Sequence, residues 1–129
     1  MRLLLDTHVL LWTVGAPERL PPAALAEITD AANEVLYSAA SIWEIAIKAS
    51  LARADFANDP ALIEREARQI GFIELPVTAR HALAVDGLAR HHKDPFDRLL
   101  LAQALVEPAW LYTADKQLAR YDGPLRFLN

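Results

Sequence analysis

Residues 2–12 read RLLLDTHVLLW, in which an apolar run ends at the acidic residue Asp6. Arg2 to Leu5 form a short apolar run, which is typical of a buried strand. A helical segment is expected to follow through Leu11 and Trp12. The stretch therefore predicts a strand that stops at an acid and leads directly into a helix.

The same alternation recurs along the rest of the chain. Further strands are predicted at residues 35–37, 72–75 and 110–113, with a possible fifth at 125–128. Further helices are predicted at residues 23–32, 41–52 with a start nearer Ser38, 60–70 with Gly71 as the C-terminal cap, 79–87, 94–104 and 115–121. Strands that alternate with helices predict an α/β fold, with a central parallel sheet of four to five strands flanked by helices.

The composition limits the class of protein. The chain has 129 residues, 53% of them hydrophobic and 23% charged, a balance typical of one compact domain over residues 1–129. Since there is no cysteine, a disulfide framework and a thiolate metal site are both excluded. The apolar N-terminus is interrupted by Asp6 and His8 and lacks a cleavage pattern. We therefore predict neither a signal peptide nor a membrane span, and we expect a cytoplasmic protein.

Two acids follow predicted strands and are candidates for a functional site. Asp6 ends the first strand, and Asp115 comes directly after the fourth, beyond Thr113. Ligands of open parallel sheets bind at the carboxyl ends of the strands, so the two acids are expected at the same edge. Each is equally suited to cap the helix that follows it. The local pattern alone does not choose between the two roles for Asp6.

Two further acids lie on predicted helices. Glu44 ends SIWE, which matches a capping box, and precedes Lys48 at the spacing of a helical ion pair. On this local evidence the two structural roles outweigh a catalytic role for Glu44, although a helix that starts nearer Ser38 places it in the second turn, beyond capping range. In DPFD, residues 94–97, Asp94 suits the N-cap, whereas an acid at Asp97 adds little to helix stability. The helix thus explains Asp94 well but Asp97 only permissively, so this stretch alone leaves the role of Asp97 open.

Four motifs together resemble a known family. They are LLLDTHVLLW, SIWEIAIK, HHKDPFDRLLLAQA and LYTADKQL, in this order and at this approximate spacing along essentially the whole chain. The chain resembles the PIN-domain ribonucleases and, more narrowly, the VapC-type toxins of prokaryotic toxin–antitoxin pairs. The resemblance implies a PIN fold in which Asp6, Glu44, Asp97 and Asp115 meet at the carboxyl edge of the sheet, with Thr113 in a supporting role.

The resemblance also implies an activity. It is metal-dependent endoribonuclease cleavage of RNA that leaves a 5′-phosphate and a 3′-hydroxyl, with the four acids as catalytic residues and metal ligands. Independently of the resemblance, four converging carboxylates repel one another unless a cation holds them, and an all-oxygen site suits Mg²⁺ or Mn²⁺. The implied partners are an RNA substrate, a small cognate antitoxin protein and a second copy of the chain in a homodimer.

The basic residues are weaker candidates. His8, His81, His91 and His92 show no zinc-binding spacing, so surface or capping roles are expected for them. Lys48, Lys93, Arg98 and Lys116 stand beside the acids and could offset phosphate charge. The net charge of −4 argues against a general nucleic-acid binder and predicts modest, salt-sensitive affinity for RNA.

Two other functions are compatible with parts of the pattern. One is a catalytically silent PIN-like binding partner in a repressor complex, which the presence of all four acids disfavours. The other is a receiver-like protein with Asp6 as phosphoacceptor. That function lacks a second acid beside Asp6 and leaves Glu44 and Asp97 unexplained.

Overall fold

The computed structural model describes residues 1–51 and 58–128 and contains one five-stranded sheet. Every strand pair is parallel, and the strand order is β3-β2-β1-β4-β5. The strands are β1 (Arg2–Leu5), β2 (Glu34–Ser38), β3 (Ile73–Leu75), β4 (Trp110–Thr113) and β5 (Leu125–Phe127). The predicted α/β fold with a parallel sheet is confirmed, including the fifth strand.

Over the described residues, six α-helices and two short 3₁₀ helices connect the strands. They are α1 (Thr7–Gly15), η1 (Pro17–Arg19), α2 (Pro22–Thr29), α3 (Ala39–Ser50), α4 (Pro60–Ile70), α5 (Ala79–Asp86), α6 (Pro95–Val106) and η2 (Lys116–Arg120). Ser38 caps α3, as its predicted start requires, and Gly71 closes α4 in the left-handed conformation, with φ 107°. The predicted end of α3 at residue 52 lies outside the described residues.

Two predicted helices differ from the structure. The helix predicted at residues 23–32 ends at Thr29, because Asp30 turns the chain: its Oδ1 accepts a hydrogen bond from the Ala32 N–H at 2.9 Å. The helix predicted at residues 115–121 is the 3₁₀ helix η2, capped by Asp115. Alanine-rich sequence favours a helix at the first of these places, but the side chain of Asp30 offers the backbone a competing turn.

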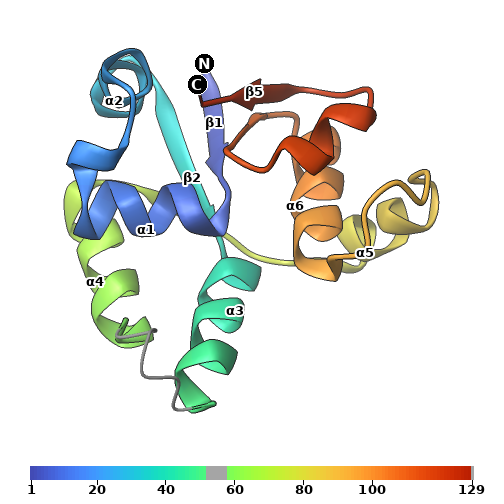
Figure 1. The fold of residues 1–129 in the computed structure, drawn as a ribbon, viewed down its shortest axis with the longest axis horizontal. Coiled ribbons are helices and arrows are strands. Elements are labelled where there is room, and N and C mark those ends of the chain that lie inside the picture. The colour runs from blue at the N-terminus through green and yellow to red at the C-terminus, as the bar shows by residue number, and fades with distance from the viewer. Residues whose placement is uncertain (52–57, 129) are drawn as a thin grey trace.

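The core lies on both faces of the sheet. Leu3 and Leu5 of β1 point to one face, where they pack with residues of α1, α2, α3 and α4, and Leu4 points to the other, where α6 and η2 cover it. Figure 1 shows the sheet between α1, α2 and α4 on one side and α5 and α6 on the other. No helix of the described residues is long and apolar enough to cross a membrane.

The topology leaves a crevice at one place on the sheet. The chain leaves β1 for its neighbour β2, whereas the strand on the other side of β1 is β4. The helices that follow β1 therefore cover one face of the sheet, whereas α6 and η2, which precede and follow β4, cover the other. At such a switch point the carboxyl ends of the strands open onto a ligand site.

Candidate active site

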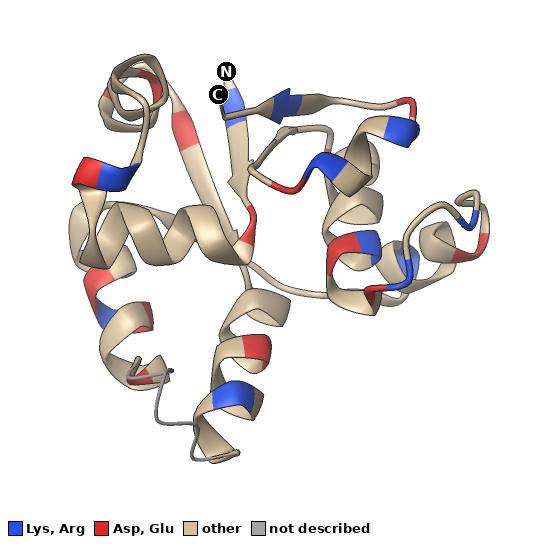
Figure 2. Cartoon of the chain, in the orientation of Figure 1, with Lys and Arg blue, Asp and Glu red and all other residues tan. Residues whose placement is uncertain are grey.

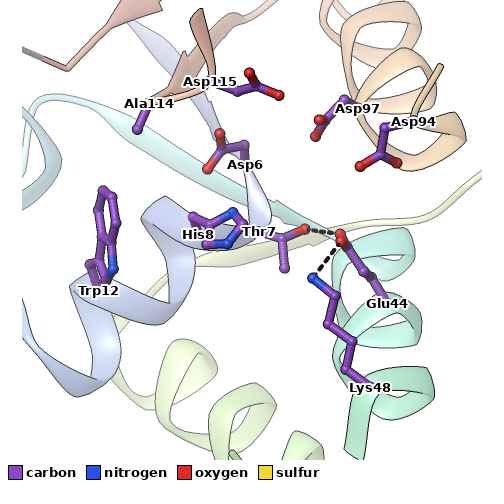
Figure 3. A pocket seen from close by; sticks show the side chains of 10 residues that line it. All are labelled: Asp6, Thr7, His8, Trp12, Glu44, Lys48, Asp94, Asp97, Ala114 and Asp115. Carbon is purple, nitrogen blue, oxygen red and sulfur yellow. Dashed lines mark hydrogen bonds and ion pairs between the residues drawn. The ribbon is translucent and has the colours of Figure 1, made fainter. Parts of the chain in front are cut away.

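A cavity of about 280 Å³ lies at the carboxyl ends of β1 and β4. Its walls come from the residue after β1, from α1, α3 and the start of α6, and from the loop after β4, and Figure 3 shows the side chains that line it. The lining residues are Asp6, Thr7, His8, Trp12, Glu44, Lys48, Asp94, Asp97, Ala114 and Asp115. The four predicted acids are thus brought together from segments that are far apart in the sequence.

Asp6 joins the central strand to α1. Its backbone N–H donates to the carbonyl of Tyr112 on β4 at 3.0 Å, and its Oδ1 accepts from the Val9 N–H at 2.8 Å. The side chain is therefore both the cap of α1 and part of the cavity wall. Burial raises the pKa of Asp6 above its ordinary value, although hydrogen bonds from Thr113 and the Val9 N–H oppose this effect. Without a cation, this carboxylate is costly to ionise.

Thr113 and Asp115 form the second side of the crevice. Thr113, the last residue of β4, is fully buried, and its Oγ1 accepts from the Asp115 N–H at 3.0 Å. Asp115 caps η2 through the Gln117 N–H at 2.9 Å. The hydroxyl of Thr113 thus touches the backbone of one acid and the carboxyl of another, Asp6. This position is consistent with the supporting role predicted for it.

Asp94 and Asp97 begin α6 and differ in what they do. Asp94 is the N-cap, as predicted, and accepts from the Phe96 N–H at 2.9 Å, while its side chain also reaches the cavity. Asp97, in the first turn, faces Asp115. Burial, together with the charges of Asp94 and Asp6, raises the pKa of Asp97 to about 7, against the opposing hydrogen bond with His92.

Glu44 reaches the cavity from the second turn of α3. Its Oε1 accepts a 2.7 Å hydrogen bond from Oγ1 of Thr7, which also lies 3.0 Å from Oγ of Ser41. Its Oε2 lies 3.1 Å from Nζ of Lys48. Ser41 lies inside α3, so the SIWE stretch is not a capping box; the expected ion pair with Lys48 does form. Figure 3 shows the contacts of Glu44 with Thr7 and with Lys48 as dashed lines.

His92 does not have the surface or capping role expected for it from the sequence. Its side chain is only 8% exposed and does not cap a helix: Nε2 lies 2.9 Å from Oδ2 of Asp97 and 3.0 Å from Oδ2 of Asp115. Burial opposes protonation, but the two carboxylates outweigh it and raise the pKa of His92. Burial likewise opposes ionisation of Asp115, yet its hydrogen bonds with the Gln117 N–H, Asp97 and His92 lower its pKa.

Of the other basic candidates, some have structural roles away from the cavity and one lysine lines it. His81 is buried and completes a capping box with Thr78 at the start of α5, in agreement with the expected capping role. Arg98 does not line the cavity. Its guanidinium donates to the carbonyls of Val85 and Leu88 at the end of α5, so the site is not where its charge acts. Lys48 is the lysine that lines the cavity.

The residues present suit a divalent cation. Carboxylate oxygens are the ligands that Mg²⁺ and Mn²⁺ prefer, and two of the acids, Asp6 and Asp97, have raised pKa values that a bound cation would reverse. In addition, His92, Asp94 and Asp97 each offer a ligand atom within 4.8 Å of the others. The arrangement can hold a cation against the phosphate of a phosphodiester.

Comparison with known families agrees with this geometry. The family model described as PIN domain matches residues 3–124. The chain belongs to the PIN-domain family. This PIN domain is 33% identical to ribonuclease VapC22 of Mycobacterium tuberculosis (strain ATCC 25618 / H37Rv) over 127 residues, which cover 94% of this chain and 92% of the relative.

Solved structures share the fold of this PIN domain. VapBC2 from Rickettsia felis bound to a DNA fragment from their promoter aligns over 100% of both chains with a TM-score of 0.74 and 14% identity. DNA-bound VapBC from Salmonella typhimurium aligns over 98% of both chains, with a TM-score of 0.70 and 14% identity. VapBC-1 from nontypeable Haemophilus influenzae also covers 98% of both, with a TM-score of 0.58 and 16% identity.

Proposed function

We propose that this PIN domain is a Mg²⁺- or Mn²⁺-dependent endoribonuclease and acts as the toxin of a toxin–antitoxin pair. The observation that carries the proposal is the convergence of Asp6, Glu44, Asp97 and Asp115 on one cavity at the switch point of the sheet. The ribonuclease named at 33% identity supports the activity. The reaction is hydrolysis of an RNA phosphodiester.

The proposal gives each acid a role. Asp6, Asp97 and Asp115 are the principal metal ligands or water-orienting groups, and Glu44 is a further ligand or the general base. A divalent cation bound there would supply Lewis acidity at the phosphate and make a water molecule more acidic. The buried Thr113 holds Asp6 and Asp115 in position relative to each other through its contacts with both.

Substrate binding depends on the site itself, because the rest of the described surface offers little general attraction for RNA. Figure 2 shows Lys and Arg spread over several elements and interspersed with Asp and Glu. The net charge is −4. Affinity for RNA is therefore expected to be modest and to fall with salt, and selectivity comes from the shape or loop sequence of the substrate.

Cleavage of a mixed RNA pool tests the proposed activity. The antitoxin-free protein is incubated with Mg²⁺ or Mn²⁺, with EDTA, and as the Asp6→Asn variant, which keeps an N-capping side chain for α1 and so serves as a matched control for contamination. Metal-dependent cutting that the variant lacks supports the proposal. No cutting by folded protein in either metal favours the catalytically silent binding partner, and the ends of any products identify the cut.

The partners belong to the same proposal. Three structures with this fold are VapBC assemblies, and this supports a small antitoxin partner for the PIN domain described here. We further propose a homodimer. Native mass spectrometry of the protein, alone and co-expressed with the product of the neighbouring gene, tests both. A monomer at micromolar concentration that forms no complex with that product contradicts the proposed assembly.

A further inference from the structure

We infer that His92 is a positioning residue that holds the carboxylates of Asp97 and Asp115 in place for the metal ion. The inference deepens the proposed function and rests on it, because it concerns the same site. The Nε2 atom of His92 lies 2.9 Å and 3.0 Å from an oxygen of each acid. One side chain thus spans two acids that come from different elements, α6 and the loop after β4.

The backbone around His92 is fixed from the side of the molecule that carries Asp115. The hydroxyl of Tyr121 accepts hydrogen bonds from the N–H groups of His91 and His92, both at 3.1 Å. Tyr121 is only 7% exposed, packs in the core and directly follows η2, which Asp115 caps. The loop before α6 is therefore tied to the segment after β4, and His92 lies where the two meet.

The buried imidazole is explained by its contacts with the acids and not by packing. Its Nδ1 atom is buried without a hydrogen-bond partner among the described residues. An unsatisfied buried polar atom costs stability, so an apolar side chain of similar size would pack at least as well. What an apolar side chain cannot do is hydrogen-bond to the carboxyl groups of Asp97 and Asp115.

The pairing of side chains in the cavity supports the same role. Glu44 contacts Lys48 at 3.1 Å, so one basic side chain serves one acid there. Asp97 and Asp115 instead share a single nitrogen atom of His92, which fixes the separation of their two carboxylates. Groups that orient metal ligands in this way contribute about ten- to a hundredfold to metal affinity.

Two amide substitutions at His92 test whether the side chain must reach both acids. In His92→Gln the side-chain amide can extend about as far as Nε2 of histidine, whereas in His92→Asn it extends only about as far as Nδ1. Both are neutral donors and differ in reach alone. The readout is Mn²⁺ affinity of the full, antitoxin-free chain, measured by calorimetry, with thermal melting by circular dichroism as the check of folding. His91→Gln, in the same loop but with its ring against Tyr121, is the control.

We expect His92→Asn to weaken Mn²⁺ binding about ten- to a hundredfold, while His92→Gln stays within a few-fold of the unmodified chain and His91→Gln does not change it. Unchanged or tighter binding by His92→Asn overturns the inference, as does an equal loss in both variants. Should His92→Asn fail to fold, His92→Leu takes its place, because an apolar side chain fills the space but cannot hydrogen-bond to the acids. Unchanged binding by that variant overturns the inference, and a loss of about ten- to a hundredfold supports it.

The outcome for the unmodified chain separates this inference from the proposed function. Protein that binds Mn²⁺ but cuts no RNA contradicts the nuclease and leaves the role of His92 to the variants. Protein that binds no Mn²⁺ overturns both, because neither a metal-dependent reaction nor a positioned metal site then exists.

Discussion

Lys48 lies one turn after Glu44 on α3, and its Nζ is 3.1 Å from Oε2 of Glu44. Both side chains line the candidate active site. The carboxylate is the more buried partner, with 10% of its side chain exposed against 37% for the lysine. Lys48 therefore matters both for the charge balance of the metal-free protein and as a cation that can meet a phosphate.

Loss of Lys48 is expected to lower stability and weaken substrate binding. In Lys48→Met, the buried carboxylate of Glu44 loses its counter-charge, so the free energy of unfolding in EDTA should fall by about 1 kcal/mol. The KM for RNA should rise because the cavity loses a positive charge. Thermal melts and cleavage kinetics measure the two effects, with Lys48→Arg as the charge-retaining control. An unchanged KM would show that Lys48 acts on Glu44 alone.

The two aspartates of DPFD should respond to substitution with opposite signs. Asp97→Asn removes a carboxylate that the fold disfavours in its ionised form, so the metal-free protein should melt at a higher temperature at neutral pH and above. The same change should lower cleavage by at least about a hundredfold, beyond the usual loss for an indirect ligand contact. Asp94→Ala removes the cap of α6 and should cost about 1 kcal/mol of stability. A higher melting temperature in both variants would contradict this division.

Binding of the metal ion should release protons and weaken at acid pH. The folded pKa of Asp97 is about 7, above its value near 3.9 in an unfolded chain, so the folded metal-free protein binds the extra proton between these limits. The contribution of Asp97 to stability is therefore greatest at low pH and is lost as the pH rises through about 7. Calorimetry in buffers with different ionisation enthalpies measures the proton release, and melts in EDTA from pH 5 to pH 8 measure the stability, with Asp97→Asn as the reference. Equal Mn²⁺ affinity at pH 5 and pH 8 would contradict the prediction that metal binding weakens at acid pH.

A hydrogen bond remote from the cavity should affect stability alone. The hydroxyl of the buried Tyr37 donates to Oε2 of Glu64 at 2.7 Å and so attaches β2 to α4, and Arg68 binds the same carboxylate oxygen at 2.6 Å. In Tyr37→Phe that bond is lost, and the free energy of unfolding should fall by about 1 kcal/mol, which corresponds to a few degrees in the melting temperature. Mn²⁺ affinity should stay the same; a change in it would mean that the sheet transmits the loss to the site.

Much of the fold and of the acid cluster could be predicted because the signals are local. The apolar run before Asp6, and the one before Thr113 and Asp115, indicate strands that end at acids. The topology of a parallel sheet then brings those ends to one edge. The local pattern assigned the N-cap to Asp94 but left the role of Asp97 open, and only the resemblance of four motifs to a family placed Asp97 and Glu44 with the other two acids.

The position of His92 could not be predicted, because tertiary contacts determine it. Nothing in HHKDPFD distinguishes His91 from His92, yet one ring lies against Tyr121 and the other between two carboxylates. The hydroxyl that fixes this loop belongs to a residue 30 positions from His91 along the chain. For the same reason Arg98, which follows Asp97 directly, turns to the end of α5 instead of the cavity.

Asp6, Asp94 and Asp115 each give one carboxylate oxygen to a main-chain N–H at the start of the following helix. A ligand that binds these carboxylates would therefore also affect the first turns of α1, α6 and η2. The amides of Val9, Phe96 and Gln117 are thus built-in reporters, and their rates of deuterium exchange follow occupancy of the cavity without any RNA or label. Because these cavity-lining carboxylates are also helix caps, a change at the cavity is expected to alter the order of the helix starts that they cap.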